Sequence, residues 1–377
     1  MVREHPAVNS DRNPGAMNAL AGAPPNREIR RGPRRRPLAA GTRRGRYPRQ
    51  VTRPHVPSEI LDLAHQRRSA REAHDFARAD ELRAAIEAGG WTVVDRGVDF
   101  DLRPLRPPDT VTDGVVRYGS STSVPSRLDE TATVPASVII VATDWPDDVA
   151  RAVRALRAES PDATQIVVVA DGATPEDEPP LAALVADGVE VVRMAQRLGQ
   201  AASINAGVRR ATGAMVIVLD ASVEATGDLV APLAAALRDP GVGVTGPWGF
   251  LSADLRHFED APTGDVDAIG GYCLAFRRMD FVERGPLDER FVFYRNLDIW
   301  WSLVLRDEGE EAAPRRAVAV ELPAIRHEHR GWTSLPAEER DRLSKRNFYR
   351  VLDRFGNRRD LLIAPSAASG STRPPRR

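Results

Sequence analysis

The sequence predicts an α/β fold in which a mostly parallel sheet carries helices on both faces, together with a small helical unit nearer the N-terminus. The main observation is that short apolar runs alternate with amphipathic segments from residue 135 onward. Alternation at this spacing is typical of β–α–β units, which build parallel sheets covered on both sides. The second observation is size, because 377 residues with 42% hydrophobic side chains suffice for two or three domains and one large core.

Residues 1–56 are rich in proline, glycine and arginine and have almost no aliphatic periodicity. Such a segment cannot bury enough apolar surface to offset its ordering entropy, so we expect it to be disordered. We expect the same of the Ser/Pro/Arg-rich residues 364–377. Arginine runs such as 34–36 make the first segment basic, so it is either a solvated tail or a weak ligand of RNA or of an anionic membrane surface.

Residues 57–107 are expected to form a separate small unit. Helical patterns cover 59–73 and 76–88, Ser58 is a plausible N-cap of the first helix, and a short strand follows over 91–94. This arrangement predicts a helical hairpin with a strand attached.

Part of this unit resembles the C-terminal helical region of cysteinyl-tRNA synthetases. The residues that carry the match lie between positions 70 and 95 and are Asp75, Phe76, Ala79, Asp80, Leu82, Arg83, Gly90 and Asp95. The resemblance implies either a reused hairpin that docks or stabilises, or a retained contact with tRNA. The polar residues 108–134, with a continuous Ser/Thr run at 120–123, are predicted to be a linker.

The alternating region begins with four apolar runs that we expect to be buried strands. They cover 137–142, 165–170, 189–194 and 214–219, and helical patterns cover 147–158, 199–211 and 227–237. Ligands of parallel sheets bind at the carboxyl ends of the strands. The candidate binding residues are therefore those that follow each strand, namely Thr143, Asp144, Asp171, Gln196, Arg197 and Asp220.

Several classes of protein are excluded by what the chain lacks. The turn after the first strand reads ATDWPDD, without the glycines of a dinucleotide-binding fingerprint, and there is no P-loop. Cys273 is the single cysteine, which excludes an intramolecular disulfide and a multi-cysteine zinc site. There is no signal peptide and no apolar run long enough for a transmembrane segment, so we expect a cytoplasmic protein.

Six blocks occur in a fixed order after residue 135. They are Asp171-Gly172, QRLGQAASINAGVRRATG at 196–213, VLDAS at 218–222, GGYCLAFRR at 270–278, LDERFVFYRNLDIWWSLVLRDEG at 287–309 and RHEHRGWTS at 326–334. In this order they resemble the family 2 glycosyltransferases of GT-A fold, which are nucleotide-diphospho-sugar transferases. The resemblance covers about residues 135–355 and implies a domain over 135–363.

The resemblance implies an inverting transfer of a sugar from a nucleotide-diphosphate donor to an acceptor hydroxyl, with the acceptor unidentified. The residues that it assigns to substrate binding are Thr143, Asp171, Arg197, Asn205, Asp220 and Ser222. The leaving diphosphate needs a divalent cation or arginines to stabilise its charge. Asp220 and His329 match the positions that would hold Mg²⁺ or Mn²⁺.

Two positions depart from the family pattern. Ser222 stands where a second aspartate would serve the cation, and a hydroxyl is a weaker ligand, although Glu224 is near enough in sequence to replace it. Asn296 stands where the family has an acidic residue, and an amide cannot accept a proton. Asp298 is therefore the predicted catalytic base, or else the acidic N-terminal residue of the helix that follows. Arg295 could face the diphosphate.

Three functions remain open at this point. The chain is a working glycosyltransferase, or a catalytically degenerate GT-A domain that binds or scaffolds, or an RNA-associated protein that acts through its hairpin and its basic tail.

Overall fold

The computed structural model describes residues 56–97, 99–105, 107–161, 163–261 and 263–363. The predicted tails, 1–56 and 364–377, lie outside the described residues except for Val56. The chain divides into two compact units, unit 1 up to Arg106 and unit 2 from Pro107 onward.

Unit 1 is a helical hairpin followed by a β-hairpin. Its elements are α1 (Ser58–Glu72), α2 (Phe76–Ala88), β1 (Trp91–Arg96) and β2 (Asp99–Pro104), and the two strands pair antiparallel. The predicted helices and first strand are confirmed, but Ser58 is not the N-cap, because Pro57 holds that position and Ser58 is already helical. A small core of Ile60, Ala64, Ile86 and Trp91 joins the two hairpins.

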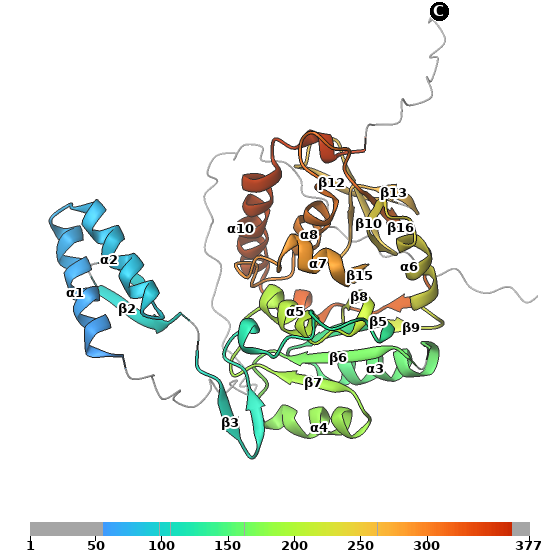
Figure 1. Ribbon diagram of the computed structural model, residues 1–377, viewed down its shortest axis with the longest axis horizontal. Coiled ribbons are helices and arrows are strands. Elements are labelled where there is room, and N and C mark those ends of the chain that lie inside the picture. Colours follow the sequence, from blue (N-terminus) through green and yellow to red (C-terminus); the bar gives the residue numbers. More distant parts are fainter. Residues whose placement is uncertain (1–55, 98, 106, 162, 262, 364–377) are drawn as a thin grey trace, which may run out of the picture. The chain divides into compact units, whose positions relative to one another are not determined.

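The centre of unit 2 is an eight-stranded sheet with the order β13-β16-β10-β15-β8-β5-β6-β7 (Figure 1). The strands are β5 (Val134–Ala142), β6 (Gln165–Ala170), β7 (Glu190–Arg193), β8 (Gly213–Leu219), β10 (Val242–Gly246), β13 (Gly264–Val266), β15 (Cys273–Arg277) and β16 (Arg316–Ala319). Strands β5 to β8 are mutually parallel, β10 and β16 are parallel, and β15 runs antiparallel between these groups.

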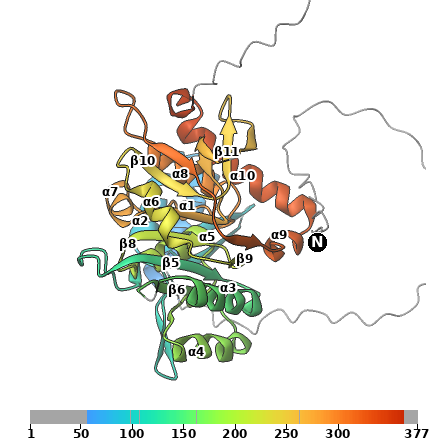
Figure 2. The ribbon, with the colours of Figure 1, turned by 90° about the vertical axis from the view of Figure 1, so that its right-hand side faces the viewer.

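Helices cover both faces of this sheet, as Figures 1 and 2 show. Because side chains alternate along a strand, Val138 and Ile140 of β5 belong to one hydrophobic core and Ile139 to the other. The first core contains α3 (Pro146–Glu159), α4 (Glu178–Ala186) and α6 (Val230–Leu237). The second contains α5 (Gln200–Arg209), α7 (Arg278–Arg284), α8 (Leu297–Arg306) and α10 (Ala337–Phe355). The predicted α/β fold class is confirmed.

Short elements complete unit 2. One pair is β9 (Val223–Ala225) with β17 (Ala324–Arg326), and a three-stranded sheet contains β11 (Gly249–Ser252), β12 (Phe258–Ala261) and β14 (Ala268–Ile269). The remaining elements are α9 (Arg330–Thr333) and the 3₁₀ turns η2 (Pro175–Asp177) and η3 (Arg359–Leu361). Within the described ranges, no helix combines the length and apolarity that a membrane span requires.

Residues 108–134, predicted to be a linker, are instead packed onto unit 2. They form a hairpin of β3 (Thr110–Thr112) and β4 (Val115–Arg117) and a 3₁₀ turn, η1 (Ser121–Ser123). The backbone of Tyr118 hydrogen-bonds to Arg193 and Ala195 beside the end of β7. The polar composition of this stretch favoured a linker. Its backbone nevertheless forms hydrogen bonds at the edge of the sheet, and no sequence pattern indicates that contact.

The order of the strands shows where a ligand would bind. Strands β5, β6, β7 and β8 follow one another in sequence, but in space β8 lies on the opposite side of β5 from β6 and β7. The chain therefore reverses its winding direction between β5 and β8. In open α/β sheets this reversal opens a crevice at the carboxyl ends of the two strands.

Candidate functional site

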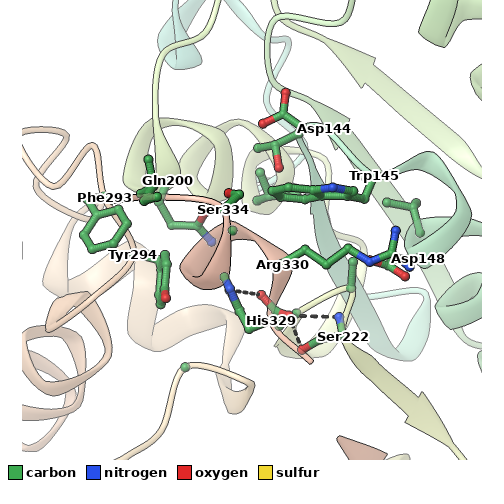
Figure 3. Close-up of a pocket in the computed structure, with 18 of the residues that line it drawn as sticks. Asp144, Trp145, Asp148, Gln200, Ser222, Phe293, Tyr294, His329, Arg330 and Ser334 are labelled. Atoms are coloured by element: carbon green, nitrogen blue, oxygen red, sulfur yellow. Dashed lines mark hydrogen bonds and ion pairs between the residues drawn. The ribbon is translucent and has the colours of Figure 1, made fainter. Parts of the chain in front are cut away.

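A cleft of about 230 Å³ lies at that reversal. Its lining includes Thr143 and Asp144 after β5 and Asp220 and Ser222 after β8. Figure 3 shows Asp144 and Trp145 on one side and Phe293 and Tyr294 on the other, with His329 between them and Ser222 below Trp145.

A second pocket, of about 70 Å³, adjoins the first. The two share Gln200, Asp220, Gly271, Tyr294 and His329 as lining residues, among others. The second pocket adds Arg295, which precedes α8, and Asp298 in the first turn of α8, and its lining is mostly apolar. Asp220 and His329 therefore lie at the boundary of one site with two compartments.

Asp220 is held by three hydrogen bonds. Its Oδ1 accepts from the backbone N–H and the hydroxyl of Ser222, at 2.9 and 2.5 Å, and its Oδ2 lies 3.2 Å from Nε2 of His329. The other ring nitrogen of His329, Nδ1, accepts the backbone N–H of Trp332 at 3.0 Å. The neutral ring therefore carries its proton on Nε2 and donates it to Asp220.

This pairing moves the pKa values of both groups. Burial raises the pKa of Asp220, but the hydrogen bonds from His329 and Ser222 outweigh burial and hold this pKa below its usual range. Burial likewise lowers the pKa of His329, but Asp220 outweighs it and raises that pKa. Asp220 is consequently held in its ionised form.

Asp298 has the opposite environment. Its Oδ2 accepts the backbone N–H of Gly271 and its Oδ1 that of Ile299, both at 2.9 Å. Burial raises the pKa of Asp298, although these N–H groups and the charge of Arg295 act in the other direction. Among the described residues, no side chain donates a hydrogen bond to either oxygen. Both predicted roles, base and first-turn acid of α8, are compatible with this position.

The residues at Asp220 fit a divalent cation in one way. Ligand atoms on adjacent corners of an octahedron with bonds of about 2.1 Å lie about 3 Å apart. The 3.2 Å between Asp220 and His329 matches that spacing, but Nε2 of His329 carries the ring proton while Nδ1 accepts the N–H of Trp332, so His329 could ligate only after losing that proton. The described part of the chain has no cluster of three or more His, Cys, Asp or Glu that could hold a metal. A cation here would therefore need oxygen ligands from a bound diphosphate as well.

Other predicted residues line the larger pocket. Thr143 does so at the end of β5, and Arg197 does so while forming a two-pronged ion pair with Asp144, with N–O distances of 2.5 and 3.2 Å. Both side chains of this pair are about half exposed. The pair links the loop after β5 to the loop before α5.

Asp171 and Asn205 lie outside both pockets. The two oxygens of Asp171 accept the backbone N–H groups of Leu198 and Gly199, at 2.7 and 3.0 Å, and the side chain is buried. Asn205 pairs with both backbone groups of Leu287, at 2.9 Å each. Here these side chains shape the loops around the cleft, and their predicted contact with substrate stays a prediction.

Two departures from the family pattern now have a structural explanation. Asn296 has a left-handed backbone with φ of 65°, which asparagine tolerates better than most residues, and its amide donates to Ser344 on α10. Glu224 does not replace the missing carboxylate, because it pairs with His327 at 2.7 Å and faces Arg151. Neither residue lines the two pockets.

Sequence reasoning missed the aromatic walls of the site. Trp145 lines the larger pocket, and Tyr272 and Tyr294 both pack against the ring of His329. Trp145 had a usable signal, because it follows the first strand directly, as a ligand-binding residue of such a sheet should. The two tyrosines lie in loops and had no such signal.

Comparison with known proteins agrees with this reading of the fold. Residues 137–266 match the family model described as Glycosyl transferase family 2. A solved structure of GalNAc-T7 with UDP, GalNAc and Mn²⁺ is 19% identical, with a TM-score of 0.47 over 60% of this chain and 48% of that chain. The mannosyltransferase PcManGT of Pyrobaculum calidifontis, in complex with GDP-Man and Mn²⁺, is 18% identical, with a TM-score of 0.38 over 53% of this chain and 59% of that chain.

The N-terminal region has a different relative. It is 45% identical over 51 residues to a cysteine–tRNA ligase of Opitutus terrae, a match that spans 14% of this chain and only 11% of the ligase. Both resemblances predicted from the sequence are thus confirmed. Residues 137–266 are therefore similar to family 2 glycosyltransferases, and the N-terminal region is similar to a small part of a cysteine–tRNA ligase.

Proposed function

We propose that unit 2 is an inverting glycosyltransferase that moves a sugar from a nucleoside-diphosphate donor to an acceptor hydroxyl. The observation that carries this proposal is the pair Asp220 and Asp298, which face one site from two elements and have pKa values shifted in opposite directions. Carboxylates with diverging pKa values are a common basis for dividing roles within an active site.

The larger pocket would hold the donor. Trp145 offers its ring to the base or the ribose, and Arg197 and Arg330 add positive charge to the lining. Asp220 would hold Mg²⁺ or Mn²⁺, which when bound neutralises the developing charge on the leaving diphosphate, and His329 would offer its Nε2–H to that diphosphate.

The second pocket would hold the reacting hydroxyl of the acceptor. Asp298 accepts the proton of this hydroxyl while the hydroxyl oxygen of the acceptor forms a bond to the anomeric carbon of the sugar. The bond from that carbon to the diphosphate oxygen breaks, and its electron pair leaves with the diphosphate. The raised pKa of Asp298 makes it a stronger proton acceptor than an ordinary aspartate.

Titration calorimetry with UDP, GDP and dTDP, with and without Mn²⁺, tests the donor half of this proposal. We expect one nucleotide to bind, and more tightly with Mn²⁺. Absence of binding for all three under both conditions would contradict the proposal. A transfer assay with labelled donor, comparing the wild type with Asp298→Asn, tests the catalytic half.

A second candidate is a domain that binds nucleotide without transferring sugar. It is favoured by Ser222, which leaves Asp220 without a second carboxylate, and by Asn296, whose amide faces α10. Any hydrolysis or transfer of a labelled donor that disappears in Asp298→Ala excludes this candidate.

An RNA-binding role receives less support from unit 1. Acidic side chains outnumber arginines in its described part, and Arg67 and Arg71 both pair with Asp95. The basic residues 1–56 lie outside the described residues. A tRNA mobility shift with the full chain at low salt tests this role, which predicts a steep loss of binding as salt rises.

A further inference from the structure

The arginines of the two compartments differ in their partners. In the larger pocket, Arg197 pairs with Asp144, and Arg330 has its Nε 3.4 Å from Asp148. At the second pocket, Arg295 is part of the lining and Arg326 lies over the ring of Tyr272, another lining residue. Across the described ranges, the side chains of Arg295 and Arg326 have neither an ion pair with a carboxylate nor a hydrogen bond.

Aromatic rings hold both guanidinium groups in place. The Cζ of Arg326 is 4.6 Å from the ring centre of Tyr272 and 5.5 Å from that of Trp248. The Cζ of Arg295 is 5.3 Å from the ring centre of Trp332. A guanidinium that stacks on a ring keeps its N–H donors at the edge, where they are available to a planar anion.

The positive charges of Arg295 and Arg326 both act on Tyr272, a residue that lines the second pocket. Burial raises the pKa of Tyr272, and the positive charges of Arg326 and Arg295 oppose this rise. Arg295 also acts on the carboxyl of Asp298. Both guanidinium groups are therefore near the hydroxyl of Tyr272, and that of Arg295 is also near the proposed base.

The size of the pocket decides what can enter it. Its volume of about 70 Å³ is less than a third of the 230 Å³ of the larger pocket. Apolar side chains, including Phe250, Leu274 and Trp301, form much of its wall. A pocket this small and this apolar suits the reacting end of an acceptor, with the rest of the acceptor at the mouth beside the arginines.

We propose that the acceptor carries an anionic group, a carboxylate or a phosphate, which Arg295 and Arg326 bind at the mouth of the second pocket while the hydroxyl enters toward Asp298. This inference rests on the function proposed for the same cleft. Two unpaired guanidinium groups offset the repulsion that an anion would meet from Asp298 and Asp220. Bidentate hydrogen bonds between guanidinium and carboxylate or phosphate supply the binding energy.

The test uses three small probes that share a hydroxyl-bearing skeleton: neutral glycerol, the carboxylate glycerate, and glycerol 3-phosphate. Each is titrated by calorimetry into the full chain saturated with its nucleoside diphosphate, which occupies the donor pocket. The variants are Arg326→Gln and Arg295→Gln. Arg354→Gln is the matched control, because Arg354 also stacks on rings, those of Trp300 and Phe355, but lines neither pocket.

We expect at least one anionic probe to bind ten or more times more tightly than glycerol, an estimate that corresponds to about 1.4 kcal/mol. Arg326→Gln and Arg295→Gln should abolish this preference and leave nucleotide affinity nearly unchanged, while Arg354→Gln keeps both. Which anion binds better distinguishes carboxylate from phosphate.

Three results would overturn the inference. They are equal or undetectable binding of all three probes, an anion preference that survives in both variants, and a loss of nucleotide affinity that assigns the arginines to the donor diphosphate. If no nucleotide binds, the proposed function fails separately. The same probes titrated into the free protein and its variants then decide whether the anion pocket exists.

Discussion

Asp220 and Asp298 line the same site, yet their surroundings shift their pKa values in opposite directions. Asp220 ends a central strand and receives side-chain hydrogen bonds from His329 and Ser222, which favour its charged form. Asp298 begins a helix and receives only backbone N–H groups, and burial disfavours its charge. The cleft thus contains one carboxylate whose charged form is favoured and one whose charged form is disfavoured, which is the division that the proposed roles require.

The largest expected effect comes from removing the proton acceptor. Asp298→Ala should lower kcat by about 10²- to 10⁴-fold, the usual contribution of a general base. The affinity for the nucleoside diphosphate should hardly change, because Asp298 faces the second pocket only. Rapid-quench rates and calorimetry on the same preparation measure both quantities. A parallel loss of nucleotide affinity would show that the two carboxylates do not divide their roles.

Removing the other carboxylate should act on binding. Asp220→Ala should weaken nucleotide binding in the presence of Mn²⁺ by about 10- to 100-fold, or about 1.4–2.8 kcal/mol. Ser222→Ala is the control, because it keeps the carboxylate and loses one hydrogen bond. We expect it to weaken nucleotide binding by no more than about 1 kcal/mol. If Asp220→Ala binds nucleotide as the wild type does, Asp220 has no part in holding the donor.

The pH dependence should separate the two groups. Activity requires ionised Asp298, so kcat/KM should fall as pH drops through the raised pKa of this group, which lies above the ordinary value of 3.8. Nucleotide affinity depends on Asp220, whose pKa is lowered, so it should persist to a lower pH. Profiles of kcat/KM and of nucleotide Kd against pH check whether kcat/KM falls at a higher pH than nucleotide affinity does. If both quantities fall over the same pH range, the assignment of Asp298 as base and Asp220 as donor-binding group is contradicted.

The smallest expected effect comes from adding a carboxylate. Ser222→Asp places a second negative charge beside Asp220 and supplies a better ligand for Mn²⁺. Nucleotide binding should strengthen a few-fold with Mn²⁺ and weaken a few-fold without it, because the two charges repel when no cation separates them. Calorimetry under both conditions measures the change, with Ser222→Asn as the uncharged control. Equal effects with and without the cation would place the metal elsewhere.

The sheet could be predicted because its central strands are buried on both faces and therefore read as continuous apolar runs. Asp220 could be predicted for a related reason, since it follows such a run directly. In the sequence Asp171 looks equivalent, but its oxygens bind backbone groups of a loop 27 and 28 residues further along the chain. Nothing in a local pattern tells whether a polar residue after a strand meets a ligand or a distant loop.

The same limit applies to Asn205, whose partner Leu287 is 82 residues away. The second pocket could not be predicted at all, because its wall combines residues from α5, β15 and the start of α8 with Phe250 of β11. Asp298 was found only through its place in a family block. Its shifted pKa arises from burial that no stretch of sequence displays.

The hairpin at residues 110–117 determines where unit 2 can be separated from the residues before it. A chain that starts at residue 135, where the alternating pattern begins, loses the backbone bonds of Tyr118 beside β7 and exposes a sheet edge to pairing with other chains. It also leaves Arg278 buried without the carbonyl groups of Arg127 and Glu130 that accept its hydrogen bonds. A chain that starts at residue 107 keeps both sets of partners. Expression of unit 2 alone should therefore yield soluble protein when the chain starts at residue 107 and aggregates when it starts at residue 135.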